Sequence, residues 1–449
     1  MGNHRDVGRL SATPSFSKQA LRALSRRATF GITPSSELLQ PPAKARWLLP
    51  SFISIWKNRL ECEVNKMAQT GAELKDLRII IIGGSIGGLS AGLTLACKNF
   101  DVEIFEKSAG EMKSRGAGLV IQPDMMQYLM EYNISPKEVF CVPITERQYL
   151  NEQGQVVLKH ANDTSFTSWD YIYKQLKDTF PAEKYHFNHQ ATKVEQSGKN
   201  VRVHFDNGAV KECDLVVGAD GYDSLVRQTY LPEHNPVYAG YIAYRGLIEE
   251  AELGADCVKF YDGRFTLYQG ADTHILSYFV PGANGALDAG KQRLNWVWYV
   301  NKSEPELQKI LLDKNREQRR FAIPLGFLSD ENVNLLREKA MAGLPEISAQ
   351  MVMKTRMPFV QVIVDLTVPK MVFGRACIIG DAAFVVRPHT ASGTSKAYND
   401  AISLATSLSY HGDRIETALE HWQYEQIRYA RQIVNYGKML ALRSGLGRR

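Results

Sequence analysis

The sequence has few cysteines and no long hydrophobic run, and both absences narrow the class of protein. Its six cysteines are scattered through 449 residues without a Cys-x-x-Cys pair, which argues against a zinc site or a disulfide framework and suits a reducing compartment. The best membrane-span candidate, 47–56, contains Pro50 and is far shorter than the roughly 20 residues that a span needs. We therefore expect a soluble or at most peripheral protein, with no metal site and no integral membrane segment.

A uniformly basic surface is also lacking, although the net charge is +6. Residues 1–70 hold eleven Lys and Arg against four Asp and Glu, and the remaining 43 basic and 44 acidic residues nearly cancel. The main body therefore gives no indication of a nucleic-acid partner. Hydrophobic and charged contents of 44% and 23% are ordinary for a soluble globular enzyme.

The first 74 residues form a basic extension that we place before the folded domains. Residues 17–32 are rich in arginine, serine and alanine and poor in acids, a composition that resembles an organellar transit peptide. Two alternatives stay open: a disordered extension, or a gene model that starts upstream of the true initiator, Met67. We favour these alternatives and expect a cytoplasmic protein. A mitochondrial location would follow if residues 1–66 were a genuine transit peptide.

After this extension, the sequence predicts a strand, a glycine-rich turn and a helix. Four isoleucines at 79–82 have the composition of a buried parallel strand. Gly83, Ser85, Gly87 and Gly88 follow, and apolar residues then recur at helical spacing. Such a turn lets backbone approach a pyrophosphate, whose charge the helix N-terminus stabilises. The middle glycine of the G-x-G-x-x-G motif is replaced by Ser85, so a tight turn without a ligand stays the alternative.

An acidic residue follows at the distance expected of a ribose-binding acid. A second alternating strand ends in Glu106, 23 residues beyond Gly83, close to the roughly 20 residues typical of dinucleotide-binding units. The alternative is an exposed acid at a strand end. Together with the glycine turn, the spacing favours a nucleotide-binding role.

Two further turns of the same kind occur later in the chain. One buried strand runs into Asp220 and Gly221, and another runs into Gly380 and Asp381. An acid held by a glycine at the carboxyl end of a strand is well placed to accept hydrogen bonds from a polyol such as ribityl. Each turn alone is compatible with a structural role, but three in this order are a much more specific signal.

The segments between these turns have a different pattern. Residues 143–183 contain alternating strands and one helix, and residues 236–300 are β-rich and aromatic. This pattern predicts a mostly antiparallel sheet that forms one wall of a pocket. Residues 303–357 are mainly helical in pattern. Two helices follow the last turn, one beginning near Thr394 and one running to about Leu442.

With these motifs the sequence resembles the FAD-dependent aromatic hydroxylases of the para-hydroxybenzoate and salicylate hydroxylase type. The segments GGSI, YAGYIAYRG, RLNWVWY and GDAAFVVRPHTASGTSKAYNDA are similar to the branch of that family that hydroxylates dihydroxypyridines. The resemblance covers roughly 75–445. It implies an α/β (α+β) fold: a discontinuous Rossmann-like FAD-binding domain of the glutathione-reductase type, with an inserted, mostly antiparallel β-sheet substrate domain and C-terminal helices.

The implied domain order alternates between these two units. The FAD-binding domain would consist of three segments, and two inserted segments would form the substrate domain. In chain order we predict the extension 1–74, FAD-binding part 75–142, substrate part 143–183, FAD-binding part 184–235, substrate part 236–368, and FAD-binding part 369–449 with the C-terminal helices.

When the binding residues of the family are assigned to matching positions of this sequence, the resemblance implies an FAD site. The first turn and Glu106 would hold the ADP half, and Asp220 would lie near the pyrophosphate and the approach of the nicotinamide. Asp381 would bind the ribityl chain, and the helix that begins near Gly393 would direct its positive end at the pyrimidine edge of the flavin. The full implied cofactor-binding set is Gly83, Ser85, Gly87, Gly88, Glu106, Asp220, Gly221, Gly380, Asp381, Gly393 and Thr394.

The resemblance also implies catalytic and substrate-binding residues. Pro388 would line the flavin face where oxygen reacts, and His389 and Arg387 are the candidates that stabilise a deprotonated substrate. A core histidine and a surface arginine are the alternatives. Four residues of the aromatic sheet are substrate-pocket candidates, with burial in the core as an equal alternative. These four are Tyr241, Arg245, Trp296 and Trp298.

The implied activity is an FAD-dependent monooxygenation that uses NADH or NADPH and O2. A flavin hydroperoxide would pass hydroxyl to an electron-rich ring, of a hydroxypyridine or phenol type such as 2,6-dihydroxypyridine. One alternative is an FAD monooxygenase of secondary metabolism that hydroxylates or epoxidises an indole or polyketide ring. A different class is a non-catalytic FAD-binding sensor. The expected partner is a small aromatic molecule, and a homodimer stays open.

The sequence departs from the family pattern at three positions. Phe384 stands where many of these hydroxylases have histidine, and Ala391 replaces the first glycine of their late Gly-x-Gly motif. Trp169 occupies the place of an arginine that often contacts FAD. We interpret these departures as features of a subgroup, with weaker flavin binding as the alternative.

Overall fold

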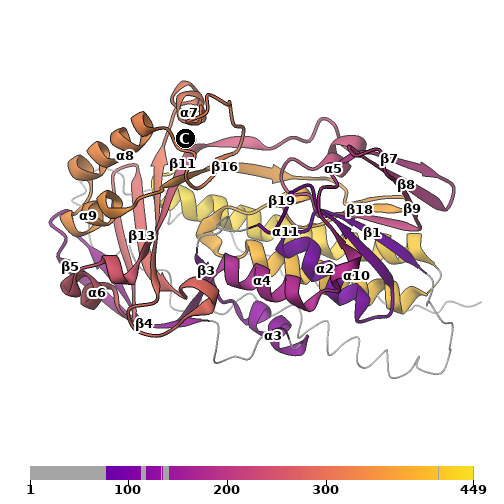
Figure 1. Ribbon diagram of the computed structural model, residues 1–449, viewed down its shortest axis with the longest axis horizontal. Coiled ribbons are helices and arrows are strands. Elements are labelled where there is room, and N and C mark those ends of the chain that lie inside the picture. The colour runs from indigo at the N-terminus through magenta and orange to yellow at the C-terminus, as the bar shows by residue number, and fades with distance from the viewer. Residues whose placement is uncertain (1–76, 113–117, 133, 135–140, 413, 448–449) are drawn as a thin grey trace, which may run out of the picture. The chain divides into compact units, whose positions relative to one another are not determined.

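The computed structural model describes residues 77–112, 118–132, 134, 141–412 and 414–447. Predictions about the extension 1–74, including Met67 as an alternative start, lie outside these residues. Two mixed sheets dominate the described part of the chain (Figure 1). Every helix within it is too short or too polar to span a membrane.

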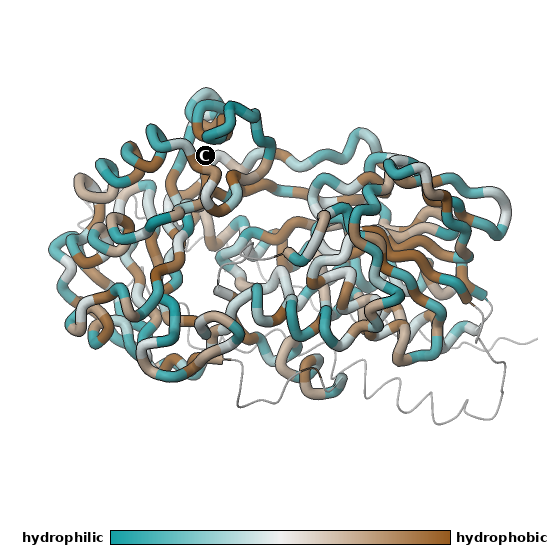
Figure 2. Tube along the Cα trace, viewed as in Figure 1, coloured by the Kyte–Doolittle hydropathy of each residue, from teal (hydrophilic) through white to brown (hydrophobic). Residues whose placement is uncertain are grey.

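The first sheet has six strands among the described residues, in the order β17-β18-β10-β1-β2-β6. It is parallel except between β17 and β18. The isoleucines of β1 are buried because β10 and β2 flank the strand and helices cover the sheet. Figure 2 shows this sheet as a group of hydrophobic strands. The strands are β1 (Arg78–Ile82), β2 (Asp101–Phe105), β6 (Tyr185–His186), β10 (Leu215–Gly218), β17 (Val372–Phe373) and β18 (Ala376–Ile378).

Six helices accompany this sheet and share its hydrophobic core. The central helix, α2, connects β1 to β2 and packs against α4 and α10. We predicted α4 as part of the substrate segment 143–183, yet its apolar side chains lie in the core of the first sheet. The helices are α2 (Ile86–Ala96), α3 (Pro123–Glu131), α4 (Trp169–Thr179), α5 (Leu225–Tyr230), α10 (Gly393–His411) and α11 (Ile415–Arg443). A three-stranded antiparallel sheet next to α5 contains β7 (Ala191–Ser197), β8 (Asn200–Phe205) and β9 (Val210–Cys213).

The second sheet has ten strands within the described residues and is antiparallel except between β12 and β4. Its main order is β15-β16-β11-β14-β13-β12-β4-β5-β3, and β19 pairs with β16. The strands are β3 (Gly118–Val120), β4 (Val142–Leu150), β5 (Val156–Ser168), β11 (Val237–Glu249), β12 (Arg264–Gly270), β13 (Thr273–Val280), β14 (Arg293–Asn301), β15 (Ala322–Ile323), β16 (Phe359–Thr367) and β19 (Phe384–Val385).

The two faces of the second sheet have separate cores. Ile242 and Tyr244 of β11 belong to a cluster shared with four helices, whereas Tyr241 and Ala243 belong to a cluster on the other face. This separation follows from the alternation of side chains along a strand. The helices are α6 (Ala255–Tyr261), α7 (Glu304–Ile310), α8 (Asp330–Gly343) and α9 (Glu346–Lys354). Single 3-10 turns occur at η4 (Ala182–Lys184), η5 (Glu250–Glu252) and η6 (Ala283–Gly285).

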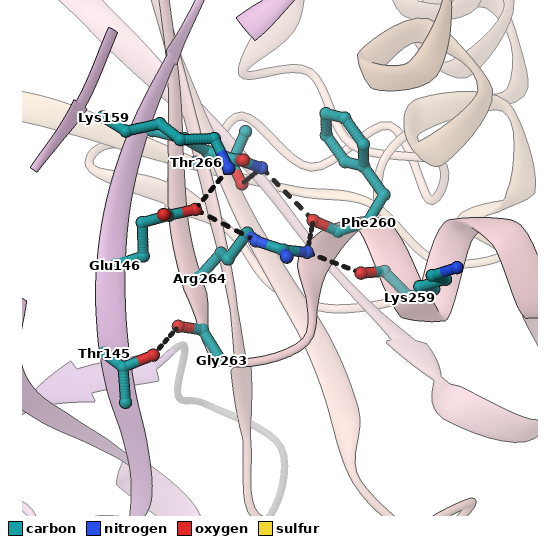
Figure 3. Close-up of polar contacts among 9 residues, drawn as sticks. Thr145, Glu146, Lys159, Lys259, Phe260, Gly263, Arg264 and Thr266 are labelled. Carbon is teal, nitrogen blue, oxygen red and sulfur yellow. Dashed lines mark hydrogen bonds and ion pairs between the residues drawn. The ribbon is translucent and has the colours of Figure 1, made fainter. Parts of the chain in front are cut away.

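Polar side chains form contacts across the parallel strands β4 and β12 (Figure 3). The Glu146 carboxylate accepts hydrogen bonds from Lys159 Nζ at 2.8 Å and from Arg264 Nε at 3.2 Å. The Lys159 hydrogen bond lowers the pKa of Glu146 against a smaller opposing effect of burial. Because these groups are solvent-accessible, each pair contributes at most about 1 kcal/mol. The junction is therefore held mainly by its backbone pairing and apolar packing.

Candidate functional site

The first glycine turn lies between β1 and α2, and its backbone is too close to its neighbours for side chains. A Cβ on Gly83 would lie 2.4 Å from the Ala219 carbonyl oxygen, and one on Gly88 would lie 1.8 Å from the Gly83 oxygen. Gly83 also has a φ of +102°, which favours glycine. Ser85 precedes α2 without a side-chain cap bond, and the first helical turn has no acidic residue. The helix N-terminus therefore keeps N–H groups available for an anion.

Glu106 closes this turn from the end of β2. Its side chain is 5% exposed, so it is not the exposed strand-end acid of the alternative interpretation. One carboxylate oxygen accepts from Gly84 N at 2.8 Å, and the other accepts from Ser108 N at 2.9 Å and Ser108 Oγ at 2.7 Å. The acid is thereby fixed beside the glycine turn.

The second turn follows β10 and leads into α5. Asp220 Oδ2 accepts from Leu225 N at 2.7 Å and from Val226 N at 3.3 Å. Its Oδ1 is buried and has no hydrogen-bond partner within the described residues. Desolvation raises the pKa of Asp220, and a hydrogen bond from Ser224 opposes that shift. A buried acceptor without a donor is expected at a ligand site.

The third turn, η7 (Gly380–Ala382), follows β18 and carries Asp381. The Asp381 side chain is exposed, yet desolvation by the surrounding protein raises its pKa. The positive charge of Lys396 opposes this shift, and the negative charge of Asp400 adds to it. The Asp381 carboxylate is therefore accessible to a ligand at this end of the sheet.

The three turns meet at one edge of the first sheet because β1, β10 and β18 are parallel neighbours. Gly83 contacts Ala219 of the second turn. Arg227, fully buried after the second turn, donates to Ala382 O of the third turn at 3.0 Å. A Cβ on Gly87 of α2 would lie 3.7 Å from Ala397 of α10. The carboxyl edge of a parallel sheet is the usual ligand position in this kind of fold.

The segment after the third turn contains the predicted catalytic residues. Arg387 is not the surface arginine of the alternative interpretation, because it forms a two-point ion pair with Asp365, at 2.8 and 2.7 Å, and is buried. Its guanidinium carbon also lies 5.5 Å from the ring centre of Tyr241. Pro388 opens η8 (Pro388–Thr390), and Ala391 then adopts a left-handed φ of 54°. The backbone at Ala391 therefore keeps the conformation for which glycine is favoured.

His389 forms a close pair with Tyr241. The Tyr241 hydroxyl lies 2.9 Å from His389 Nε2, and the Tyr241 side chain is fully buried. The His389 ring centre lies 4.5 Å from Tyr299 and 6.3 Å from His274. Desolvation, followed by the charges of His274 and Arg387, lowers the pKa of His389 to about 3. Desolvation raises the pKa of Tyr241, so both groups are neutral near pH 7.

Arg245 lies on the same face of the second sheet as Tyr241, four residues further along β11. Its Nε is buried without a hydrogen-bond partner, and no ion pair of Arg245 occurs among the described residues. Desolvation raises the pKa of Tyr278 and Tyr299, and the positive charge of Arg245 lowers both values. The face therefore combines phenols with a cation that has no counterion in the described part of the chain.

Trp296 and Trp298, the other two pocket candidates, lie on the opposite face of the second sheet from Arg245. Arg245 pairs with Val297 across β11 and β14, so the two tryptophans point away from it. Both side chains belong to the core beneath α7, α8 and α9, and Trp296 Nε1 donates to Thr355 Oγ1 at 2.8 Å. These residues stabilise the sheet from its far side.

The segment after α11 returns to the face that carries Tyr241. Leu446 is 1% exposed and belongs to the same cluster as Tyr241. Asn301 Nδ2 donates to Gly445 O at 2.8 Å, and Asn301 Oδ1 accepts from Gly447 N at 3.0 Å. This segment covers the sheet beside Tyr241 and shields it from water.

Sequence reasoning missed three members of this site. Tyr299 and His274 contact His389, and Asp365 holds Arg387. The alternation His-Ile-Leu-Ser-Tyr in β13 indicated a two-faced strand but not which face lies toward the cofactor turns. Asp365 had no local signal, because its partner lies 22 residues away on another element.

These features fit FAD. The first turn leaves no room for side chains where a pyrophosphate would pass, and the second supplies an orphaned buried acceptor. The third supplies an exposed carboxylate, and α10 after it has an N-terminus with no side-chain cap and no acid in its first turn. An elongated cofactor with a diphosphate and a polyol matches this order of groups.

Comparisons with known proteins agree with this site. A family model described as FAD binding domain-like matches residues 238–365. The 2,6-dihydroxypyridine 3-monooxygenase of Paenarthrobacter nicotinovorans is 33% identical over 368 residues, which cover 82% of this chain and 91% of that protein. The 6-hydroxynicotinate 3-monooxygenase of Pseudomonas fluorescens is 25% identical over 382 residues, which cover 75% of this chain and 83% of that protein.

The structural comparison gives the same result. The solved structure of 2,6-dihydroxypyridine-3-hydroxylase from Arthrobacter nicotinovorans matches with a TM-score of 0.78 and 32% identity, covering 82% of this chain and 92% of that chain. The mixed α/β architecture with a Rossmann-like unit is thus confirmed. The chain therefore belongs to the FAD-dependent aromatic hydroxylases, which are monooxygenases that use FAD, NADH or NADPH, and O2 on small aromatic substrates.

Proposed function

We propose that the substrate is a hydroxypyridine such as 2,6-dihydroxypyridine, or a phenol of similar size. The observation that carries this proposal is the neutral Tyr241–His389 pair at 2.9 Å, on a sheet face that also holds the unpaired Arg245. An electron-rich ring is a better nucleophile after it loses a hydroxyl proton. A neutral imidazole can accept that proton, and a guanidinium without an acidic partner stabilises the resulting anion. The 2,6-dihydroxypyridine relative supports this substrate class.

The cofactor turns have separate tasks in this proposal. Bound FAD, with NAD(P)H and O2, supplies the oxygen-transfer chemistry. The first turn and Glu106 would hold its ADP half, Asp220 and Gly221 would lie by the diphosphate, and Asp381 would accept hydrogen bonds from the ribityl chain. The remaining contacts come from Gly380, Gly393 and Thr394.

The segment 387–389 connects the cofactor to the substrate in this proposal. Pro388 would line the flavin face, and His389 would accept the substrate proton through Tyr241. Arg387 acts as a positioning residue, because its guanidinium is held in an ion pair with Asp365 and lies over the Tyr241 ring. The substrate anion is therefore stabilised by Arg245 rather than by Arg387.

We propose a division into two domains, each built around one of the two large sheets. The FAD-binding domain consists of 75–142, 184–235 and 369–449, and the substrate domain consists of 143–183 and 236–368. Three elements cross these limits: α4 packs with the first sheet, and β3 and β19 pair in the second.

We further propose a cytoplasmic location, with the mitochondrial alternative tied to residues 1–66. The five cysteines among the described residues are all free, as a reducing compartment favours. A homodimer stays a prediction, which the mass of the purified protein in solution tests.

Product analysis tests the proposed substrate. The purified enzyme, loaded with FAD, is offered hydroxypyridines, salicylates and indoles, and NAD(P)H consumption is compared with the hydroxylated product formed. We expect the highest kcat/KM and near-stoichiometric product with a hydroxypyridine. A higher kcat/KM with an indole would support the secondary-metabolism alternative, and flavin binding without turnover on any ring would contradict the proposal.

Replacing Arg245 by glutamine is expected to raise KM for the ionised substrate about 10- to 100-fold, because a hydrogen bond to a charged group contributes roughly 1.5–3 kcal/mol. FAD content should stay at the wild-type level. Steady-state kinetics across pH measures the effect. Arg202→Gln is the matched control, since Arg202 lies exposed on β8. An unchanged KM in Arg245→Gln would remove Arg245 from the substrate site.

A further inference from the structure

Helix α11 ends in a turn that returns the chain to the sheet face of Tyr241. Gly445 adopts a left-handed φ of 68°, and its N–H donates to Leu442 O at 3.0 Å. The Leu446 N–H donates to Ala441 O at 2.9 Å. These two bonds form the Schellman arrangement, in which a left-handed glycine lets the chain leave a helix. The turn thereby brings Leu446, which is 1% exposed, into one apolar cluster with Ala441 and Tyr241.

The second sheet holds this turn through Asn301 at the end of β14. The Asn301 side chain donates to Gly445 O and accepts from Gly447 N, so it pairs with the turn as a neighbouring strand would. Gln269 Nε2 of β12 also donates to Arg443 O at 3.3 Å. Because three side-chain bonds fix its backbone, the turn is attached to the sheet at two strands.

The same stretch of chain contacts the segment that carries the predicted catalytic residues. A Cβ on Gly437 of α11 would lie 3.3 Å from Arg387 Cβ. A Cβ on Gly447 would lie 3.2 Å from Arg387 Nη1 and 3.8 Å from Tyr241 Cδ1. The helix and the turn therefore both contact Arg387, and the turn also contacts the Tyr241 ring.

We propose that Leu446 is a positioning residue for the Tyr241–His389 pair. Held by Asn301 and by the end of α11, its side chain closes the sheet face beside Tyr241 and keeps water away from the hydrogen bond of the pair. The consequence for hydroxylation rests on the proposed function of this pair. The exclusion of water does not, because it concerns residues that are in place before a substrate binds.

Exclusion of water affects the pKa of His389. Desolvation lowers this pKa to about 3. Water beside the pair would weaken the desolvation, so the pKa would rise toward the ordinary value of about 6.5. The titratable and charged groups around the imidazole stay unchanged in the test below. They are Tyr241 of β11, His274 of β13, Tyr299 of β14, and Arg387 with its partner Asp365 of β16, near Lys438 of α11.

The test follows the carbon-13-labelled imidazole of His389 by NMR in the FAD-loaded protein without substrate, over roughly pH 5 to 8. His389→Ala identifies its signal. The wild-type signal should not titrate, because the pKa lies below this range. In Leu446→Ser the signal should shift as the pH falls toward the raised pKa. If the serine variant does not fold, Asn301→Ala carries the same expectation, because it releases the turn.

Two further variants separate this role from a general loss of packing. Leu336→Ser is the matched control, because Leu336 is also 1% exposed but belongs to the core on the opposite face of the second sheet. Its His389 signal should stay as in the wild type, and so should that of Leu446→Ile, which refills the same position. A signal that does not titrate in folded Leu446→Ser, or one that titrates equally in Leu336→Ser, would overturn the proposal.

The ratio of product to NAD(P)H consumed then tests the consequence for hydroxylation. It should fall in Leu446→Ser and stay at the wild-type value in Leu446→Ile. If His389 titrates in Leu446→Ser while this ratio stays normal, the exclusion of water by Leu446 is supported, and the proposed role of the Tyr241–His389 pair in the reaction is contradicted.

Discussion

Replacing Asp381 by alanine is expected to give a folded protein that purifies without FAD. The carboxylate is exposed at the third turn, where desolvation raises its pKa and the charge of Lys396 opposes that shift. Loss of a hydrogen bond to a charged acceptor costs roughly 1.5–3 kcal/mol. The affinity for FAD should therefore fall about 10- to 100-fold for each ribityl hydroxyl that loses its acceptor.

The flavin-to-protein absorbance ratio of the purified variant measures this loss. Asp381→Asn keeps the shape of the side chain without its charge and should bind FAD with intermediate affinity. Asp288→Ala removes an exposed acid before β14 and should leave flavin content unchanged. An Asp381→Ala protein that is fully flavinated and active would show that the third turn does not hold the cofactor.

His389→Ala is expected to retain FAD but to uncouple NAD(P)H oxidation from hydroxylation. The imidazole lies 2.9 Å from the Tyr241 hydroxyl, so it is placed to accept a proton that passes through this phenol. Removing a general base typically lowers the rate by about 10² or more. NAD(P)H can still reduce FAD without this proton transfer. The electrons that no longer serve hydroxylation should then reduce O2 to hydrogen peroxide.

The burial of His389 also predicts how the coupling of NAD(P)H oxidation to hydroxylation depends on pH. Desolvation lowers the pKa of His389 to about 3, so the proton-accepting form is present above that value and is lost only as the pH falls toward it. Coupling in the wild type should therefore show no inflection from this residue near the ordinary histidine pKa of about 6.5. The ratio of product to NAD(P)H consumed, measured across pH, tests this expectation.

Tyr241→Phe removes the hydroxyl group that contacts His389, so it tests the same pair of residues from the other side. If the two groups act as one relay, each single variant should lose similar coupling, and the double variant should lose little more. Normal coupling in His389→Ala would remove this residue from the reaction. Additive losses would show that the two groups act separately.

The cofactor turns could be predicted from the sequence because each depends on local chemistry. Gly83 and Gly88 are glycines because any Cβ would collide with neighbouring backbone. Glu106 could be predicted as a nucleotide-binding acid because one helix and one strand set the number of residues between the turn and the end of β2. The helix predicted near Thr394 begins at Gly393. Comparisons then confirmed the family that these motifs had suggested.

The pocket residues could be predicted only in part. Side-chain alternation along a strand implies that Tyr241 and Arg245 share one face of β11 and that Trp296 and Trp298 share one face of β14. It did not show that these faces are opposite, because that depends on the pairing of Arg245 with Val297. A shift of one residue in this register would have reversed the result.

The sequence by itself determined the class of protein, the cofactor and the order of its three turns, since these depend on composition, glycine positions and short spacings. The tertiary structure decided the rest. It brought His389 to Tyr241 across 148 residues and neutralised Arg387 with Asp365. It also buried Lys396 and Asp400, whose helical spacing was visible but whose burial was not. These contacts depend on how sheets and helices pack, and no local pattern encodes that packing.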